Sequence, residues 1–186
     1  MKFAIVSDTH GNAANFKKVV SWLNKEDIKL ILHAGDIGSP ESLKESLEEF
    51  NGEFFGVFGN MDKDYKILID EHNRTPRVKI EQEVMKIAIG KNTKLLTNSS
   101  ELVNGKKVIA VTHFPAEAKK LAQSGNFDLV FYGHTHMAWE EKIGAPAGGS
   151  CRMINPGELA GQFYKPTFAV YDTETDKLEL KILEKL

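Results

Sequence analysis

Three short apolar segments, separated by two helical patterns, constrain the fold of this chain most strongly. The segments are "FAIV" (3–6), "KLILHAG" (29–35) and "EFFGVFG" (53–59). Each is a continuous apolar run rather than an alternating one, which is typical of a strand covered on both faces. The strand–helix–strand–helix–strand order predicts a parallel sheet joined by right-handed crossovers.

The two helical patterns place apolar residues on one face of a helix. These residues are Phe16, Val19, Val20 and Leu23 in the first pattern and Leu43, Leu47 and Phe50 in the second. Ser39 is a suitable N-cap for the second helix, and Pro40 then takes its first helical position. The first part of the chain is therefore predicted to be α/β.

The middle of the chain is less regular. Residues 62–98 have mostly helical propensity, with a break at Thr75-Pro76. We expect a helical insertion over 80–98, whose apolar positions Val84, Ile87 and Leu95 fit a lid, a dimer surface or a buried face.

The remaining segments return to strands. Asn104-Gly105 predicts a hairpin turn. The later elements are expected to be a strand ending at 112, a helix at 115–126, a buried strand at 127–133 and a terminal hairpin at 167–183. Because we find no repeat, linker or low-complexity segment, residues 1–186 are expected to form one α/β domain.

Charge and cysteine content exclude some classes of protein. The formal net charge is −2 and no long run of one sign occurs, which argues against a broad nucleic-acid surface. The single cysteine, Cys151, rules out an internal disulfide and indicates a reducing compartment. No segment reads as a signal peptide or a membrane span, so we expect a cytoplasmic protein that does not contact membranes.

Residues able to bind metal ions follow five of the predicted strands. They are Asp8, His10, Asp36, Asn60, His113, His134 and His136. Taken one at a time, such residues are typical of turns, N-caps or hydrogen-bonded polar groups. Ligands bind at the carboxyl edge of an open α/β sheet, however. Their occurrence at five strand ends therefore predicts a metal site.

The ligand chemistry indicates two divalent ions. Carboxylate and amide oxygens together with imidazole nitrogens suit Mn²⁺, Fe²⁺, Zn²⁺ or Ni²⁺, and we expect Mn²⁺. The seven ligands fall one short of four for each of two ions, so one ligand is expected to bridge. Asp36 is the natural bridge because a carboxylate has two oxygens. The positive charge left over would attract a phosphate ester without a basic patch.

These motifs, in this order, resemble those of the calcineurin-like metallophosphoesterases. The family pattern appears as "SDTHG" (7–11), "AGDIG" (34–38), "GNMD" (59–62), "VTHF" (111–114) and "YGHTH" (132–136). The late "INPGE" (154–158) resembles the small single-domain phosphodiesterase branch, which includes the retromer scaffold subunit. The resemblance implies a four-layer α/β/β/α sandwich with two mixed sheets.

The resemblance also implies a division of the ligands and a reaction. The first metal would be held by Asp8, His10, Asp36 and His136, and the second by Asp36, Asn60, His113 and His134. A hydroxide between the two ions would attack phosphorus in line with the leaving oxygen. The region of Asn60 would help to neutralise the charge on the phosphate. We therefore expect a phosphoesterase that acts on small phosphate esters, diesters more than monoesters.

Two departures from the family pattern concern the leaving group. Many relatives carry a histidine directly after the Gly-Asn pair that is thought to protonate the leaving group, whereas Met61 stands there in this chain. Asp62 and a water molecule are the candidates for that catalytic role, and for Asp62 a helix N-cap is the alternative. Many relatives also have a second histidine near the lone one, where this chain has Phe114-Pro115.

Four other residues complete the prediction. Asn155 is a candidate for substrate binding, with a plain turn as the alternative. His33 is expected to be a buried, hydrogen-bonded neighbour of Asp36 rather than a ligand, His72 to be solvated, and Cys151 to be inert.

Two other functions compete with a phosphoesterase. An inactive interaction scaffold, as in the retromer subunit, would be marked by a lost ligand, and none is lost. A nucleotide-binding domain is disfavoured because the chain lacks both G-x-G-x-x-G and the Walker lysine motif. Homo-oligomerisation is left open.

Overall fold

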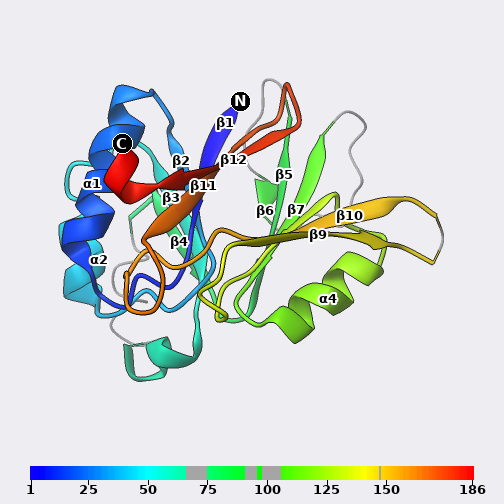
Figure 1. Ribbon diagram of the computed structural model, residues 1–186, viewed down its shortest axis with the longest axis horizontal. Helices are drawn as coiled ribbons and strands as arrows, with labels where there is room; N and C mark the ends of the chain where they lie inside the picture. The colour runs from blue at the N-terminus through cyan, green and yellow to red at the C-terminus, as the bar shows by residue number, and fades with distance from the viewer. Residues whose placement is uncertain (66–74, 91–95, 98–105, 147) are drawn as a thin grey trace.

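Two six-stranded sheets lie between layers of helices in the computed structural model (Figure 1). The structure describes residues 1–65, 75–90, 96–97, 106–146 and 148–186. Helices α1 (Ala13–Lys25) and α2 (Pro40–Leu47) cover the outer face of one sheet, and α4 (Pro115–Gln123) covers that of the other. Both sheets mix parallel and antiparallel pairs, so the predicted four-layer α/β fold is confirmed.

The first sheet has the order β12-β11-β1-β2-β3-β4. Its strands are β1 (Lys2–Val6), β2 (Leu30–His33), β3 (Glu53–Val57), β4 (Val78–Glu81), β11 (Thr167–Asp172) and β12 (Lys177–Ile182). β1 to β4 are parallel, and β11 and β12 form an antiparallel hairpin. The predicted parallel unit and the terminal hairpin are therefore confirmed.

The second sheet has the order β6-β5-β7-β8-β10-β9. Its strands are β5 (Val84–Ile89), β6 (Leu96–Thr97), β7 (Lys107–Thr112), β8 (Leu129–Phe131), β9 (Trp139–Gly144) and β10 (Ser150–Asn155). β7, β8 and β10 are parallel to one another. β9 and β10 are strands that the sequence patterns do not predict.

Side-chain caps mark the starts of α1 and α2. The Asn12 side chain accepts a hydrogen bond from the Asn15 N–H at the start of α1. Ser39 does the same for Ser42 at the start of α2, with Pro40 at the first helical position, as predicted. Two short 3₁₀ helices, Asn60–Tyr65 and Leu183–Lys185, also occur in the described ranges. No helix in the described ranges is long and apolar enough to cross a membrane.

Three buried apolar clusters hold the layers together. Along β1, Phe3 and Ile5 point between the two sheets, while Ala4 and Val6 face α1 and α2. This alternation gives each strand two apolar faces, which explains the continuous apolar runs in the sequence. The third cluster lies between α4 and the second sheet and includes Cys151, which is buried as a small apolar residue.

The expected helical insertion over 80–98 is wrong for the part that the structure describes. Residues 78–81 and 84–89 form β4 and β5 instead. Met85, Ile87 and Ile89 are buried between the sheets, whereas Lys86 is exposed. Met85, Ile87 and Ile89 thus recur at every second position, and this two-residue period is the signal that the prediction overlooked. Burial of these side chains between the sheets overrides the helical propensity of the segment. Leu95, His72 and the Asn104-Gly105 turn lie outside the described residues.

Candidate metal centre

The strand register brings the predicted ligands to one edge. In the first sheet Val6 pairs with His33, and His33 pairs with Gly56, so β1, β2 and β3 end side by side. Hydrogen bonds then join the loops that follow: the Asp8 N–H donates to the backbone carbonyl of Gly35, and the His10 N–H donates to the backbone carbonyl of Asp36. His113 and the "YGHTH" segment follow the neighbouring parallel strands β7 and β8 of the second sheet.

Asp8, His10 and His136 form the first group of candidate ligands. Their donor atoms all lie within 4.8 Å of one another. The Nε2 atoms of His10 and His136 are 3.2 Å apart, and the Nε2 of His136 lies 3.5 Å from Asp8 Oδ1. Asp36 Oδ2 lies 3.9 Å from the Nε2 of His10. These are the four residues that the sequence assigned to the first metal.

Asn60, His113 and His134 form the second group. Asn60 Oδ1 lies 3.0 Å from the Nε2 of His113 and 3.0 Å from the Nδ1 of His134. Asp36 Oδ2 lies 3.5 Å from the Nε2 of His113. The same carboxylate oxygen of Asp36 therefore faces both groups, as a bridging ligand would.

The donor separations fit metal ions. Ligand atoms about 2.0–2.2 Å from an ion stand roughly 3.0–3.6 Å from one another, and most of the measured separations lie in this range. His113 is hydrogen-bonded through Nδ1 to the Ala34 carbonyl, and His136 is hydrogen-bonded through Nδ1 to Glu158. Both rings therefore donate through Nδ1 and turn an Nε2 lone pair to the centre. Imidazole lone pairs and carboxylates that converge in this way repel one another unless a cation lies between them.

The backbone is strained at these ligands. Five of the seven have a positive φ, a region that L-residues rarely adopt: Asp8 (51°), His10 (44°), Asp36 (56°), His134 (68°) and His136 (62°). In the described part of the chain, only Asp27 and Asp176 are other non-glycine residues with this property. Such strain costs on the order of 1 kcal/mol or more per residue and gathers at functional sites. Tight turns after the strands thus aim the ligands at one point.

Burial sets the protonation of the centre. It raises the pKa of Asp8 to about 7, and the nearby charge of Asp36 acts in the same direction. Burial also lowers the pKa of His10 and of His113, so these imidazoles are neutral at neutral pH. Neutral imidazoles beside carboxylates are the protonation state that metal binding requires.

His33 is buried and hydrogen-bonded, as predicted, although its partners are Thr9 and Gly35. Its Nδ1 accepts the Gly35 N–H at 3.1 Å, so its Nε2 donates to Thr9 Oγ1 at 3.0 Å. Thr9 in turn donates to the Ile37 carbonyl at 2.8 Å. Burial lowers the pKa of His33 to about 3, so the ring stays neutral. His33 therefore ties the loop after β1 to the loop after β2.

Glu158 is a residue of the centre that the sequence analysis missed. Its carboxylate is fully buried and lies 3.0 Å from the Nδ1 of His136. It also accepts backbone N–H groups of Gln162, Phe163 and Tyr164. Burial raises the pKa of Glu158, but these hydrogen bonds outweigh it and hold the pKa below its usual value. An acidic residue at the end of "INPGE" was the available signal.

Glu158→Gln should weaken metal binding by about 10- to 100-fold, because the acceptor that orients His136 is lost. The glutamine amide keeps the shape of the Glu158 side chain, but its NH₂ group then faces N–H groups that need an acceptor. Titration with Mn²⁺ against a chelating dye measures the affinity. Glu140→Gln is the control, since Glu140 pairs with Arg152 at 2.6 Å. Equal affinities in the two variants would contradict the role given to Glu158.

Asp62 and Asn155 are both engaged with the protein itself. The Asp62 carboxylate is fully buried and accepts the N–H groups of Gly38 at 3.0 Å and Gly59 at 2.7 Å. Asn155 donates to the Gly133 carbonyl at 2.9 Å and accepts the Gly157 N–H at 2.8 Å. These contacts favour positioning of the ligand loops over contact with substrate.

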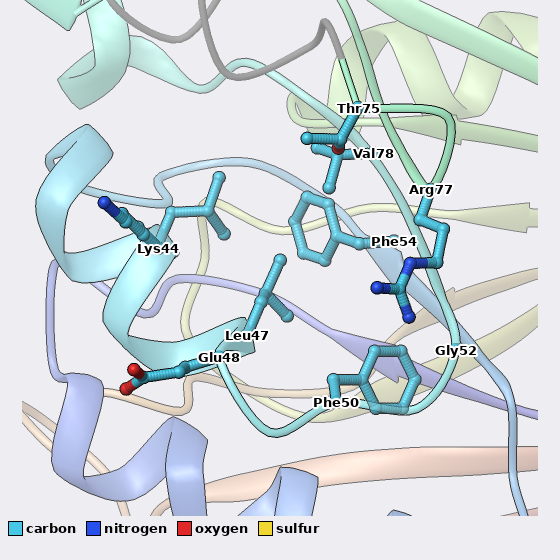
Figure 2. Close-up of a pocket in the computed structure, with 10 residues that line it drawn as sticks. Lys44, Leu47, Glu48, Phe50, Gly52, Phe54, Thr75, Arg77 and Val78 are labelled. Atoms are coloured by element: carbon cyan, nitrogen blue, oxygen red, sulfur yellow. The ribbon is translucent and has the colours of Figure 1, made fainter.

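A separate hollow of about 220 Å³ lies between α2 and the strands β3 and β4 (Figure 2). Leu47, Phe50, Phe54 and Val78 form its apolar wall. None of the seven predicted metal ligands lines it, so the chemistry of the centre lies elsewhere.

Comparison with known proteins agrees with this geometry. Residues 1–176 match the family model of the calcineurin-like phosphoesterase superfamily domain. A phosphodiesterase of Methanocaldococcus jannaschii is 29% identical, with 99% of this chain and 100% of the relative aligned. A probable metallophosphoesterase of Methanothermobacter thermautotrophicus is 26% identical, with 98% and 92% aligned.

Solved structures show the same fold. An archaeal phosphodiesterase superposes with a TM-score of 0.73 at 26% identity, covering 98% of this chain and 99% of that one. Vps29 of Chaetomium thermophilum superposes with a TM-score of 0.57 at 15% identity, covering 98% and 94%. At that identity the second likeness concerns the fold alone.

Proposed function

Since the chain belongs to the calcineurin-like phosphoesterase superfamily and is a metal-dependent phosphoesterase, we propose that it hydrolyses phosphodiesters with two divalent ions. The observation that carries the proposal is the position of Asp36, whose Oδ2 faces His10 at 3.9 Å and His113 at 3.5 Å. A phosphodiesterase among the relatives supports diesters as the substrate class. We expect Mn²⁺ to serve as the ion.

The ligands would divide between the two ions. Asp8, His10, Asp36 and His136 would hold one, and Asp36, Asn60, His113 and His134 the other. When bound, such a pair of ions lowers the pKa of a water molecule and so supplies hydroxide near neutral pH for in-line attack on phosphorus.

The protein's own groups would orient the phosphate. Asn60 is the candidate for this task, because its carboxamide lies between His113 and His134 and carries N–H groups besides the ligating oxygen. Asp62 would act indirectly, since it fixes the Gly59 N–H next to Asn60. Both carboxylate oxygens of Asp62 are engaged by backbone N–H groups, those of Gly38 and Gly59, rather than turned to a leaving group.

The reaction rate should depend steeply on the leaving group. Met61 is 59% exposed next to Asn60, and its thioether has no proton to donate. Without a general acid, a leaving oxygen of high pKa departs slowly. A series of diesters with leaving groups from nitrophenol to alkyl alcohol measures this dependence of kcat/KM. Equal rates across the series would show that an acid is present, whereas no hydrolysis of any member would refute phosphodiesterase activity.

Metal affinity should rise with pH up to about 7. Because burial raises the pKa of Asp8 to about 7, an ion must displace a proton from this carboxylate below that pH. Between pH 5 and 7 the affinity for Mn²⁺ should therefore increase about tenfold per pH unit and then level off. Competition with a chelator whose own protonation is known gives the profile. A flat profile from pH 5 to 8 would contradict a protonated Asp8.

An inactive scaffold is the alternative function. A scaffold has no need of complete metal ligation, yet all seven predicted ligands are present and converge. The strained backbone at five of them has a cost in stability that is explained by metal binding. The geometry therefore supports the enzyme better.

A further inference from the structure

A hollow of about 300 Å³ opens directly beside the second group of ligands. It shares Asn60 and His113 with that group, so a phosphate bound at the metals would lie at its inner end. Phe58 and Phe114 form apolar parts of its lining. Its volume lies at the lower end of small-molecule sites and suits a single aromatic ring.

Phe114 is held in place at the hollow. It follows His113 and immediately precedes Pro115, the first residue of α4. Its ring meets those of His113 and His134 edge-on, with centroids 5.0 and 5.1 Å away. Even so, 44% of the residue is exposed. A fixed aromatic ring with a free surface gains stability when a second apolar group covers it.

The polar residues of the hollow are acidic or neutral. Gln82, Glu83 and Glu117 line it, and among the residues that the structure describes no lysine or arginine does. Glu117 is offset by Lys120 at 3.1 Å, whereas Glu83 makes no ion pair with any residue in the described ranges. A ligand group with negative charge would therefore meet repulsion here.

We propose that this hollow is the subsite for one ester substituent of the substrate, and that it takes an aromatic or similarly apolar group without negative charge. The inference rests on the proposed function, because it requires phosphate to bind at the metal centre. It adds a preference that the metal ligands themselves do not explain, since they contact the phosphate and not its substituent.

Binding of non-hydrolysable phosphonates to the Mn²⁺-loaded protein tests the proposal by calorimetry. Inorganic phosphate reports on the metal centre alone. Phenylphosphonate should bind about tenfold more tightly than methylphosphonate, as expected when one ring is buried. (4-Carboxyphenyl)phosphonate should lose most of this gain.

Two phenylalanine variants locate the effect. Phe114→Ala should bring the ratio of phenyl to methyl affinity close to one. Phe163→Ala is the matched control, because Phe163 is 74% exposed and packs 5.2 Å from the His136 ring but does not line the hollow. The ratio cancels any general loss of phosphate affinity. The double variant Glu83→Gln, Glu117→Gln provides a second test that does not depend on the folding of Phe114→Ala. It should restore binding of the carboxyphenyl compound.

The outcomes separate the two proposals. Wild-type protein that does not bind phosphate would refute the proposed function and this subsite with it. Phosphate binding with equal affinities for phenyl- and methylphosphonate would refute the subsite only. A preference that survives Phe114→Ala but disappears in Phe163→Ala would place the substituent against Phe163 and overturn the assignment.

Discussion

Asp36→Asn should reduce the metal content from two ions per chain to one or none and lower diester hydrolysis at least about a hundredfold. The carboxylate faces both groups of ligands, and the amide offers one neutral oxygen in its place. That oxygen can keep the hydrogen bond from the Met61 N–H, which Asp36 Oδ1 accepts at 2.8 Å. Metal analysis after dialysis and steady-state kinetics on an aryl diester measure the two effects.

The loss should not come from unfolding. Asp36 lies near the buried Asp8 carboxylate, so its neutralisation removes a repulsion from the metal-free protein. The metal-free variant is therefore expected to melt at or above the wild-type temperature. Asp128→Asn is a matched control, because Asp128 also accepts a backbone N–H, that of Val108 at 2.7 Å, but lies outside the centre. Two tightly bound ions in Asp36→Asn would contradict the bridging role.

Gly59→Ala should damage the same site by steric displacement. A Cβ at residue 59 would stand 2.0 Å from Asp36 Oδ1 and 2.4 Å from Asp36 N. Because one of these atoms is backbone, a side-chain rotation cannot relieve both contacts. We expect a loss of stability of about 1–3 kcal/mol and a fall in Mn²⁺ affinity of at least about tenfold. Thermal melting without metal and Mn²⁺ titration measure these separately.

Gly144→Ala is the control for the added methyl group. Gly144 lies in β9, and its Cβ would meet no atom within 4 Å. This variant should match wild-type protein in both measurements. Wild-type metal affinity in Gly59→Ala would show that the Asp36 loop tolerates displacement. It would contradict the claim that close packing of the loops after β2 and β3 holds Asp36 in position.

The sequence was sufficient to predict the parallel strands and the edge at which the candidate ligands gather. β1, β2 and β3 are covered on both faces, so their apolar runs stand out, and each run stops where a ligand begins. The seven candidate ligands stand out in the sequence because metal chemistry limits the residue types that occur at a strand end. The structure then adds the distances that bring Asp36 between the two groups.

Elements that depend on distant contacts were harder to predict. β5 has only a weak alternation of buried and exposed residues, and its antiparallel pairing with the neighbouring strand β7, about 20 positions later in the chain, stabilises it as a strand. Glu158 was overlooked because nothing local links it to His136, which lies 22 positions earlier. Asp62 and Asn155 have polar side chains that suit catalysis as well as support. Only their hydrogen-bond partners in the structure favour a role in positioning the ligand loops.

Anomalous diffraction from crystals of the Mn²⁺-loaded protein tests the central claim most directly. The account predicts two peaks, one beside Asp8, His10 and His136 and one beside Asn60, His113 and His134, with Asp36 within bonding distance of both. A single peak, or two peaks of which Asp36 contacts only one, would contradict it.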